Sequence, residues 1–283
     1  MIAVVYSGSR FANWRLAGKG VETIEVRTNG INPFFNDEKY ILQMLHKNPK
    51  LIDYAEQIKK IYFFGAGSSS PERNEIVNNA FSKFFRYSKV FVAHDLDAAA
   101  KASCDDKPGI VCIIGSGSNL SFFDGKRVIE NNFGLGYALA DEGSTNWLSQ
   151  QLIKSYLNET LPKDLETLFE KKYEFDRRLI LDKIYKQAHP NIFFNIFADF
   201  FTENRDHIYI KELIKTGFEQ FMDIYLLPTS KKYGGKQPIY FVGSVAANFQ
   251  DILREVAKEK KINISTVIKE PIYNLLNYYA NKN

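Results

Sequence analysis

The sequence predicts an α/β fold built from two similar units. Apolar strand-like segments alternate with helix-like segments through the first hundred residues, as is typical of a domain with a partly parallel sheet. An apolar strand, a corner of small residues and a hairpin strand follow one another at residues 2–28, and the same layout returns at residues 110–130 after the turn-forming segment DDKPG. A repeated α/β unit predicts two domains with a cleft between them.

The N-terminal half carries strand signals at IAVVYS, NWRLAG and VETIEVR, separated by turn-forming residues. Asn36-Asp37-Glu38 predicts a helix start, followed by one long amphipathic helix from Glu38 to about Ile58. The elements expected next are a strand at Lys60 to Phe64, a Gly65-Ala66-Gly67 turn, a helix opened by Pro71, a strand at Val90 to Ala93 and an alanine-rich helix from Leu96.

The C-terminal half starts with an apolar strand at Ile110 to Ile114 and a hairpin, LSFFDGKRVIE, around Asp124-Gly125. Residues 146–232 are expected to be mostly helical. The elements expected after them are strands at Ile239 to Val242 and Thr266 to Lys269 and a terminal helix at Pro271 to Ala280.

Composition is that of an ordinary globular protein, with 45% apolar and 25% charged residues and a net charge of +4 over 283 residues. No apolar run reaches the roughly 18 residues that span a bilayer, and the N-terminus lacks the basic region of a signal peptide. We therefore expect a cytoplasmic protein without a membrane partner. The lysines are scattered, which argues against nucleic-acid binding.

The two cysteines, Cys104 and Cys112, lie in neither a CxxC pair nor a His-rich context. Two buried thiols are expected rather than a disulfide framework or a zinc site.

The stretch VVYSGSRFANW, at residues 4–14, raises the first functional question. A strand that feeds the corner Ser7-Gly8-Ser9 can bring backbone N–H groups to a phosphate. Tyr6 and Arg10 are bulky where such a loop usually carries a carboxylate or a hydroxyl. A phosphate loop, a damaged phosphate loop and a plain hairpin all remain open at this point.

A second small-residue corner, Gly115-Ser116-Gly117-Ser118-Asn119, directly follows a buried strand. It offers close backbone approach and side-chain donors for anionic oxygens, although a hairpin turn without a ligand has the same pattern. Gly243-Ser244 after the strand YFV is a weaker signal of the same kind.

Asp95 follows a strand and opens a helix, a place where carboxylates face ligands in open α/β sheets. It is a candidate general base for a substrate hydroxyl. The alternative is that Asp95 or Asp97 simply caps the helix.

Two loops carry candidate sugar-binding groups. GLGYALADEGST, at residues 134–145, joins closely spaced glycines to Asp141 and Glu142, which suit sugar hydroxyls or simply favour a helix N-terminus. Asn32 in NGINPFF either binds a ligand or forms an Asx turn.

A resemblance joins these segments. GINPFF, YFFGAG, HDLDAAAKA, PGIVCIIGSGSN, LGYALADEGS, FVGSVA and KEPIYNLLNYY, in this order, resemble the N-acetylglucosamine kinase-like proteins of the BadF/BadG/BcrA/BcrD ATPase family. That family belongs to the superfamily of sugar kinases, actin and the heat-shock ATPases. The resemblance runs essentially end to end.

The resemblance implies two ribonuclease-H-like domains, at residues 1–107 and 108–269, with a helical insertion at about 146–232 and a C-terminal helix at about 270–283 packed back on the first domain. It implies ATP and Mg²⁺ as cofactors and transfer of the γ-phosphoryl group to an amino-sugar hydroxyl. A homodimer contact would fit the helical insertion.

The resemblance also assigns site residues. Asp95 matches the catalytic base. The matching phosphate positions are Ser7, Gly8, Ser9, Arg10, Gly115, Ser116 and Gly117. The matching sugar positions are Asn32, Ser118, Asn119, Gly134, Gly136 and Asp141, and Gly243 and Ser244 match the nucleotide site.

The opening loop departs from the family pattern. Tyr6 stands where an aspartate helps to hold Mg²⁺, Arg10 stands where a threonine approaches the phosphates, and Ala140 replaces a glycine. Either the protein is a kinase in which Arg10 takes over part of the phosphate neutralisation, or it is a regulatory pseudokinase that binds sugar or nucleotide.

The reductase-activator branch of the family is a third alternative. It needs cysteines that hold an iron–sulfur cluster, and Cys104 and Cys112 do not match that arrangement.

Overall fold

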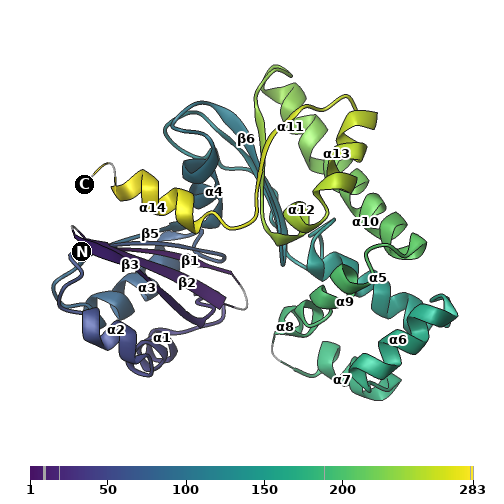
Figure 1. Ribbon diagram of the computed structural model, residues 1–283, viewed down its shortest axis with the longest axis horizontal. Coiled ribbons are helices and arrows are strands. Elements are labelled where there is room, and N and C mark those ends of the chain that lie inside the picture. The colour runs from purple at the N-terminus through teal and green to yellow at the C-terminus, as the bar shows by residue number, and fades with distance from the viewer. Residues whose placement is uncertain (9–10, 19, 188, 281, 283) are drawn as a thin grey trace. The chain divides into compact units, whose positions relative to one another are not determined.

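The computed structural model describes residues 1–8, 11–18, 20–187, 189–280 and 282 (Figure 1). The chain divides into two compact units. Unit 1 comprises Met1–Gly109, Phe123–Ile129 and Glu270–Asn283, and unit 2 comprises Ile110–Phe122 and Glu130–Lys269. Each unit contains one sheet with helices packed on it, which confirms the predicted α/β class. No helix in the described ranges is long and apolar enough to cross a membrane.

The sheet of unit 1 has the strand order β3-β2-β1-β4-β5. Its strands are β1 (Ile2–Ser7), β2 (Phe11–Gly18), β3 (Val21–Asn29), β4 (Lys60–Gly65) and β5 (Lys89–His94). The first three strands pair antiparallel, whereas β4 pairs parallel with both β1 and β5. The carboxyl ends of β1, β4 and β5 therefore meet at one edge of the sheet.

Helices cover both faces of this sheet (Figure 1). They are α1 (Glu38–His46), α2 (Pro49–Tyr54), α3 (Pro71–Phe84), α4 (Asp95–Ser103) and α14 (Ile272–Ala280). Side chains alternate across a strand, so Ala3 and Val5 of β1 join the core under α1, α2 and α3, while Val4 joins the core under α4 and α14. Strands buried on both faces read as continuous apolar runs, which is why residues 2–5 of β1 and residues 61–64 of β4 are apolar or aromatic.

The single helix predicted from Glu38 to about Ile58 is wrong. Lys47 ends α1, and Asn48 then caps α2 by accepting the Leu51 N–H with its side chain. Pro49 cannot continue a helix but is well suited to begin one. The amphipathic pattern continues across the break because both helices pack on the same face of the sheet.

The sheet of unit 2 has the order β7-β6-β8-β9. Its strands are β6 (Gly109–Ile114), β7 (Ser118–Phe123), β8 (Ile239–Val242) and β9 (Ile264–Ile268). β8 pairs parallel with β6 and with β9. The order β7-β6-β8-β9 corresponds to β2-β1-β4-β5 in unit 1, so the sheet of unit 2 has the same arrangement with one strand fewer.

The predicted hairpin after β7 is reduced to one isolated bridge between Phe123 and Val128. Asp124 Oδ1 accepts the N–H groups of Lys126 and Arg127, which closes a tight turn. The Asn131 side chain then donates to the Leu120 carbonyl at 2.6 Å. A side chain therefore takes a backbone acceptor that a paired strand would use.

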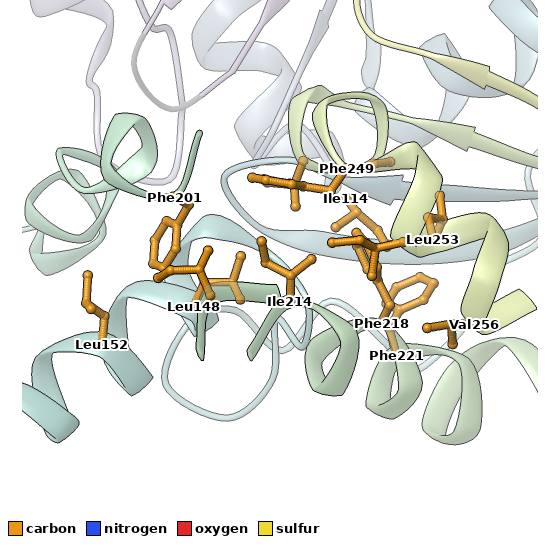
Figure 2. Close-up of a cluster of buried hydrophobic side chains, with 14 of the residues drawn as sticks. Ile114, Leu148, Leu152, Phe201, Ile214, Phe218, Phe221, Phe249, Leu253 and Val256 are labelled. Carbon is orange, nitrogen blue, oxygen red and sulfur yellow. The ribbon is translucent and has the colours of Figure 1, made fainter. Parts of the chain in front are cut away.

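The remaining helices belong to unit 2. They are α5 (Thr145–Leu157), α6 (Lys163–Tyr173), α7 (Arg177–Tyr185), α8 (Pro190–Asn195), α9 (Ala198–Glu203), α10 (Ile208–Phe221), the π-helix η1 (Met222–Leu226), α11 (Leu227–Lys232), α12 (Ser244–Asn248) and α13 (Gln250–Glu259). Figure 2 shows apolar side chains of α5, α10 and α13 in one buried cluster that also includes Ile114 of β6. This core fixes the end of β6, from which the small-residue corner at residues 115–117 projects.

Candidate functional site

Asp95 lies at the junction of β5 and α4, at the carboxyl edge of the unit 1 sheet. The cap of α4 is made by its neighbours. His94 is the N-cap residue, whose side chain accepts the Leu96 N–H, and the Asp97 carboxylate accepts the His94 N–H at 3.3 Å. The sequence left open whether Asp95 or Asp97 caps the helix. In the structure His94 and Asp97 form the cap, and Asp95 takes no part in it.

The Asp95 carboxylate is left with spare hydrogen-bonding capacity. Its Oδ1 is buried and has no hydrogen-bond partner in the described part of the chain, although it lies 3.0 Å from His94 Nδ1. Buried carboxylate oxygens are normally hydrogen-bonded, because burial removes their water. An oxygen in this state is suited to accept a hydrogen bond or a proton from a ligand hydroxyl.

Tyr6 lies close to this carboxylate. It lies on the sheet face that α4 and α14 cover. Burial raises the pKa of the Tyr6 phenol far above its usual value of 10.0, and the negative charge of Asp95 raises it further. The phenol is therefore neutral at physiological pH, a hydrogen-bond donor and not an anionic ligand.

The magnesium ion that the resemblance implies needs oxygen ligands, chiefly carboxylates. Position 6 offers only a neutral phenol, and the described residues contain no group of three or more His, Cys, Asp or Glu side chains placed to hold a metal ion. Asp97 is committed to the helix cap. The residues present do not fit a magnesium site built by the protein.

The first corner is held by internal hydrogen bonds. The Ser7 hydroxyl accepts the Ile31 N–H at 2.7 Å and donates to the Ile31 carbonyl at 2.9 Å, and Ser7 is buried. Gly8 N–H bonds to the Phe11 carbonyl at 3.0 Å. The predicted phosphate residues Ser9 and Arg10 lie outside the described residues. The described donors Ser7 Oγ–H and Gly8 N–H thus already have protein partners.

Asn32 forms the Asx turn that the sequence offered as one alternative. Its Oδ1 accepts the Phe34 N–H at 2.9 Å. The side chain also packs against the turn after β4, where a Cβ on Gly67 would lie 2.0 Å from Asn32 Oδ1. Gly67 has a φ of +80°, so this turn needs glycine both for its backbone and for its contact with Asn32.

The second corner sits on the first turn of α5. Gly115 N–H bonds to the Gly117 carbonyl at 2.9 Å, which makes the corner tight. Thr145 and Asn146, at the start of α5, donate their N–H groups to the carbonyls of Gly115 and Ser116 at 2.9 and 3.0 Å. The corner is thereby fixed from both sides.

The structure brings this corner together with the segment at Gly243 and Ser244, within unit 2. Gly243 has a φ of +126°, and a Cβ there would lie 2.4 Å from the Ile114 carbonyl oxygen. A Cβ on Gly115 would in turn lie 3.9 Å from the backbone nitrogen of Ser244. Two segments assigned separately to phosphate and nucleotide are therefore neighbours.

Asp141 is the central polar residue of unit 2. It is 5% exposed and has a φ of +73°. Its Oδ1 accepts the Ser118 N–H at 3.0 Å, and its Oδ2 accepts Asn146 Nδ2 at 2.9 Å. A Cβ on Gly117 would lie 3.0 Å from the same carboxylate. Asp141 thus holds the corner, the 134–143 loop and α5 together.

The other predicted sugar residues of unit 2 lie beside this point. Asn119 Oδ1 accepts the Leu120 N–H at 2.8 Å, and a Cβ on Gly134 would lie 2.7 Å from Asn119 Nδ2. Ser118 Oγ is buried and has no hydrogen-bond partner among the described residues. Gly136 has a φ of +78° and open space around its Cα.

Asn146 and Tyr225 contribute to the site without having been predicted from the sequence. Asn146 follows the DEGST motif directly, and that proximity is the only local signal it offers. Tyr225 donates its hydroxyl to Glu142 Oε2, and burial, together with that bond, raises the pKa of the phenol. Ala140, which replaces a glycine of the family pattern, is buried and donates its N–H to the Gly136 carbonyl at 2.9 Å.

Comparison with known proteins finds a sequence relative of this chain among solved structures. No protein-family model and no curated protein sequence matches the chain. A candidate N-acetylglucosamine kinase from Porphyromonas gingivalis is 31% identical, with 99% of each chain covered and a TM-score of 0.91.

More distant structures share the fold. A candidate N-acetylglucosamine kinase from Chromobacterium violaceum is 14% identical, with 98% of this chain and 99% of that chain covered and a TM-score of 0.60. A ROK-family glucokinase from Streptomyces griseus, in complex with glucose and AMPPNP, is 13% identical, with 95% and 93% covered and a TM-score of 0.53. The predicted fold of two ribonuclease-H-like domains is confirmed.

Proposed function

Because the chain belongs to the N-acetylglucosamine kinase-like family of sugar kinases, we propose that it binds ATP and an amino sugar and transfers the γ-phosphoryl group to a sugar hydroxyl. The observation that carries this proposal is the Asp95 carboxylate. Its buried Oδ1 has no hydrogen-bond partner among the described residues, while the adjacent helix cap is made by other side chains.

Asp95 is the general base of this proposal. As the sugar hydroxyl oxygen forms its bond to the γ-phosphorus, the bond from that phosphorus to the bridging oxygen of ADP breaks, and the hydroxyl proton passes to Asp95. The protein then supplies mainly positioning and charge neutralisation.

The phosphate side of the site is assigned to unit 2. The corner at Gly115, Ser116 and Gly117 allows close backbone approach, and it adjoins Gly243 and Ser244. For the nucleotide, this arrangement offers backbone N–H groups and hydroxyls without a side-chain barrier.

The sugar is proposed to bind polar groups that can still form hydrogen bonds. Ser118 Oγ has no hydrogen-bond partner within the described residues, and Asn119 keeps an amide donor beside Gly134. Asn32 uses its Oδ1 in the Asx turn, so its amide Nδ2 is the group proposed to face the sugar.

A second candidate, a regulatory pseudokinase that binds sugar or nucleotide without turnover, is favoured by Tyr6. Its phenol is neutral and cannot replace the carboxylate that the family uses with magnesium. In the kinase alternative, Arg10 takes over part of the phosphate neutralisation.

A coupled assay with ATP, Mg²⁺ and a panel of hexosamines separates the two candidates. The natural protein is compared with the Tyr6→Asp, Arg10→Thr double variant, and Tyr185→Phe serves as a control on an exposed tyrosine. Turnover by the natural protein supports the kinase, whereas turnover only by the double variant supports the pseudokinase. Calorimetry with N-acetylglucosamine and with ATP, separately, tests binding alone, and absence of both would overturn the proposal.

A homodimer through the helical insertion belongs to the same proposal. Leu179, Ile192 and Ile208 are exposed apolar side chains of α7, α8 and α10. Sedimentation velocity of the natural protein and of an Ile208→Ser variant tests it. A dimer that the substitution weakens supports this contact, and a monomer at every concentration rejects it.

A further inference from the structure

A line of buried amides connects Asp141 to the helical insertion. Asn146 Nδ2 donates to Asp141 Oδ2 at 2.9 Å, and Asn195 Nδ2 donates to Asn146 Oδ1 at 3.0 Å. Asp141 is 5%, Asn146 5% and Asn195 7% exposed. The three residues come from the 134–143 loop, α5 and α8, so the relay joins segments that are distant in the sequence.

The orientation of each amide in the relay is dictated by its neighbours. Asn195 Nδ2 also donates to the Asn191 carbonyl at 2.7 Å, which fixes the Asn195 amide as a donor toward Asn146. Asn146 must then accept with its Oδ1 and present its Nδ2 to the carboxylate, because an amide has one acceptor end and one donor end. Asn195 therefore determines that the Asn146 amide presents its nitrogen, and not its oxygen, to Asp141.

This orientation matters because Asp141 is held in an unfavourable backbone conformation. A non-glycine residue at a φ of +73° persists only where its surroundings hold it. Its carboxylate oxygens bond Ser118 N–H and Asn146 Nδ2, and in a buried environment each charge-assisted bond is strong and costly to lose. Reversal of the Asn146 amide would place oxygen against oxygen at Asp141.

We propose that Asn195 is a positioning residue for the proposed sugar and phosphate segments: through Asn146 it fixes Asp141, and through Asp141 it fixes the Ser118 backbone and the 134–143 loop. This inference rests on the proposed function. A side chain of the helical insertion thus sets the affinity for the sugar without touching it.

The chain provides a matched control at the same contact between helices. Ser149 Oγ, on α5, donates to the Phe194 carbonyl at 2.8 Å and is fully buried. It links α5 to α8 as Asn195 does, but its hydroxyl donates to a backbone carbonyl outside the relay. Ser149→Ala therefore removes an α5–α8 bond and leaves the relay intact.

The test compares Asn195→Asp with Ser149→Ala. An ionised aspartate at 195 only accepts hydrogen bonds, so at pH 8, where the carboxylate form is favoured, Asn146 must turn its Nδ2 toward it and its Oδ1 toward Asp141. Calorimetry with N-acetylglucosamine is expected to show about tenfold weaker binding for Asn195→Asp, the equivalent of one lost charge-assisted bond, and unchanged binding for Ser149→Ala. Equal sugar affinity in both variants would overturn the proposal.

A second measurement does not depend on any ligand. Hydrogen exchange of the Ser118 amide, which donates to Asp141, is expected to accelerate about tenfold in Asn195→Asp and to stay unchanged in Ser149→Ala. If the natural protein binds no sugar, the proposed function fails, and this exchange still decides whether the relay exists. Unchanged exchange in Asn195→Asp rejects the relay.

Loss of folding is covered by a third variant. If Asn195→Asp does not fold, Asn195→Ala removes the donor without adding a charge, and the same exchange and binding measurements apply. Melting temperatures of the folded variants separate a purely structural role, which lowers stability in both the 195 and 149 variants, from positioning, which changes affinity and Ser118 exchange in the 195 variant alone.

Discussion

Asp97 closes the capping box of α4 by accepting the His94 N–H at 3.3 Å, and the neighbouring Asp95 is left out of it. Asp95→Asn should therefore leave the cap intact. We expect it to lower phosphoryl transfer by roughly 10²- to 10⁴-fold, the usual contribution of a general base, with little change in melting temperature. Steady-state kinetics and thermal unfolding check both parts, in the natural protein or in the double variant, whichever is active.

Asp97→Ala is the control for this substitution. It removes the capping acceptor, so we expect a loss of about 1 kcal/mol in stability with turnover per folded molecule largely retained. Wild-type turnover in Asp95→Asn, or loss of turnover in Asp97→Ala alone, contradicts the assignment of the base.

The separate roles of these two aspartates could not be predicted from the sequence. Both stand in the first turn of α4, and carboxylates are favourable there in either role. The capping residue is distinguished from the candidate base only by which carboxylate lies within hydrogen-bond distance of the His94 N–H, and the sequence does not give that distance. The strand, the helix and the candidate pair were all predictable; the choice within the pair was not.

Ser7 shows a different limit. Its hydroxyl bonds the backbone of Ile31, a partner 24 residues away in the sequence, so no local pattern could reveal it. The break between α1 and α2, by contrast, has a local signal in the sequence: Asn48-Pro49 is a capping residue followed by a proline. The continuous amphipathic pattern concealed that break because both helices bury the same face of the sheet.

Gly243 is expected to tolerate no side chain. Its φ of +126° is unfavourable for other residues, and a Cβ would lie 2.4 Å from the Ile114 carbonyl oxygen, which is backbone and cannot move aside. We expect Gly243→Ala to cost roughly 3 kcal/mol or more and to weaken ATP binding, measured by chemical denaturation and calorimetry.

Gly235→Ala is the matched control for the backbone strain. Gly235 has a φ of +71°, and a Cβ there would meet no atom within 4 Å, so only conformational strain of about 1–2 kcal/mol is expected. Equal losses in the two variants would show that the contact with Ile114 is unimportant.

Tyr6 is expected to link stability to alkaline pH. Its folded-state pKa is raised above the ordinary value of 10.0 by burial and by Asp95, so its contribution is fully present below pH 10 and is lost as pH rises further. Tyr6→Phe should therefore reduce the fall in unfolding free energy between pH 9 and pH 11. Denaturant titrations at several pH values measure this slope. Tyr185→Phe, at an exposed position, should leave it unchanged, and an unchanged slope in Tyr6→Phe would show that the phenol ionises freely in the folded protein.

Cys104 and Cys112 are expected to be inert in the folded protein. Both thiols are buried and free, and burial raises the pKa of Cys104 to about 11 and that of Cys112 well above its usual value. The thiolate is the reactive form, so at pH 8 alkylation should follow unfolding, with both cysteines modified rapidly only in denaturant. Because the folded-state pKa values are raised, the thiols favour the folded state below pH 9 and lose that contribution as pH rises.

Mass spectrometry after timed exposure to iodoacetamide measures the alkylation of these thiols. The same experiment bears on an iron–sulfur role, since cluster ligation requires thiolates that can reach a subunit surface. Rapid modification of native Cys104 at pH 8, or stoichiometric iron in anaerobically purified protein, would contradict the buried-thiol assignment and favour the reductase-activator alternative over a sugar kinase.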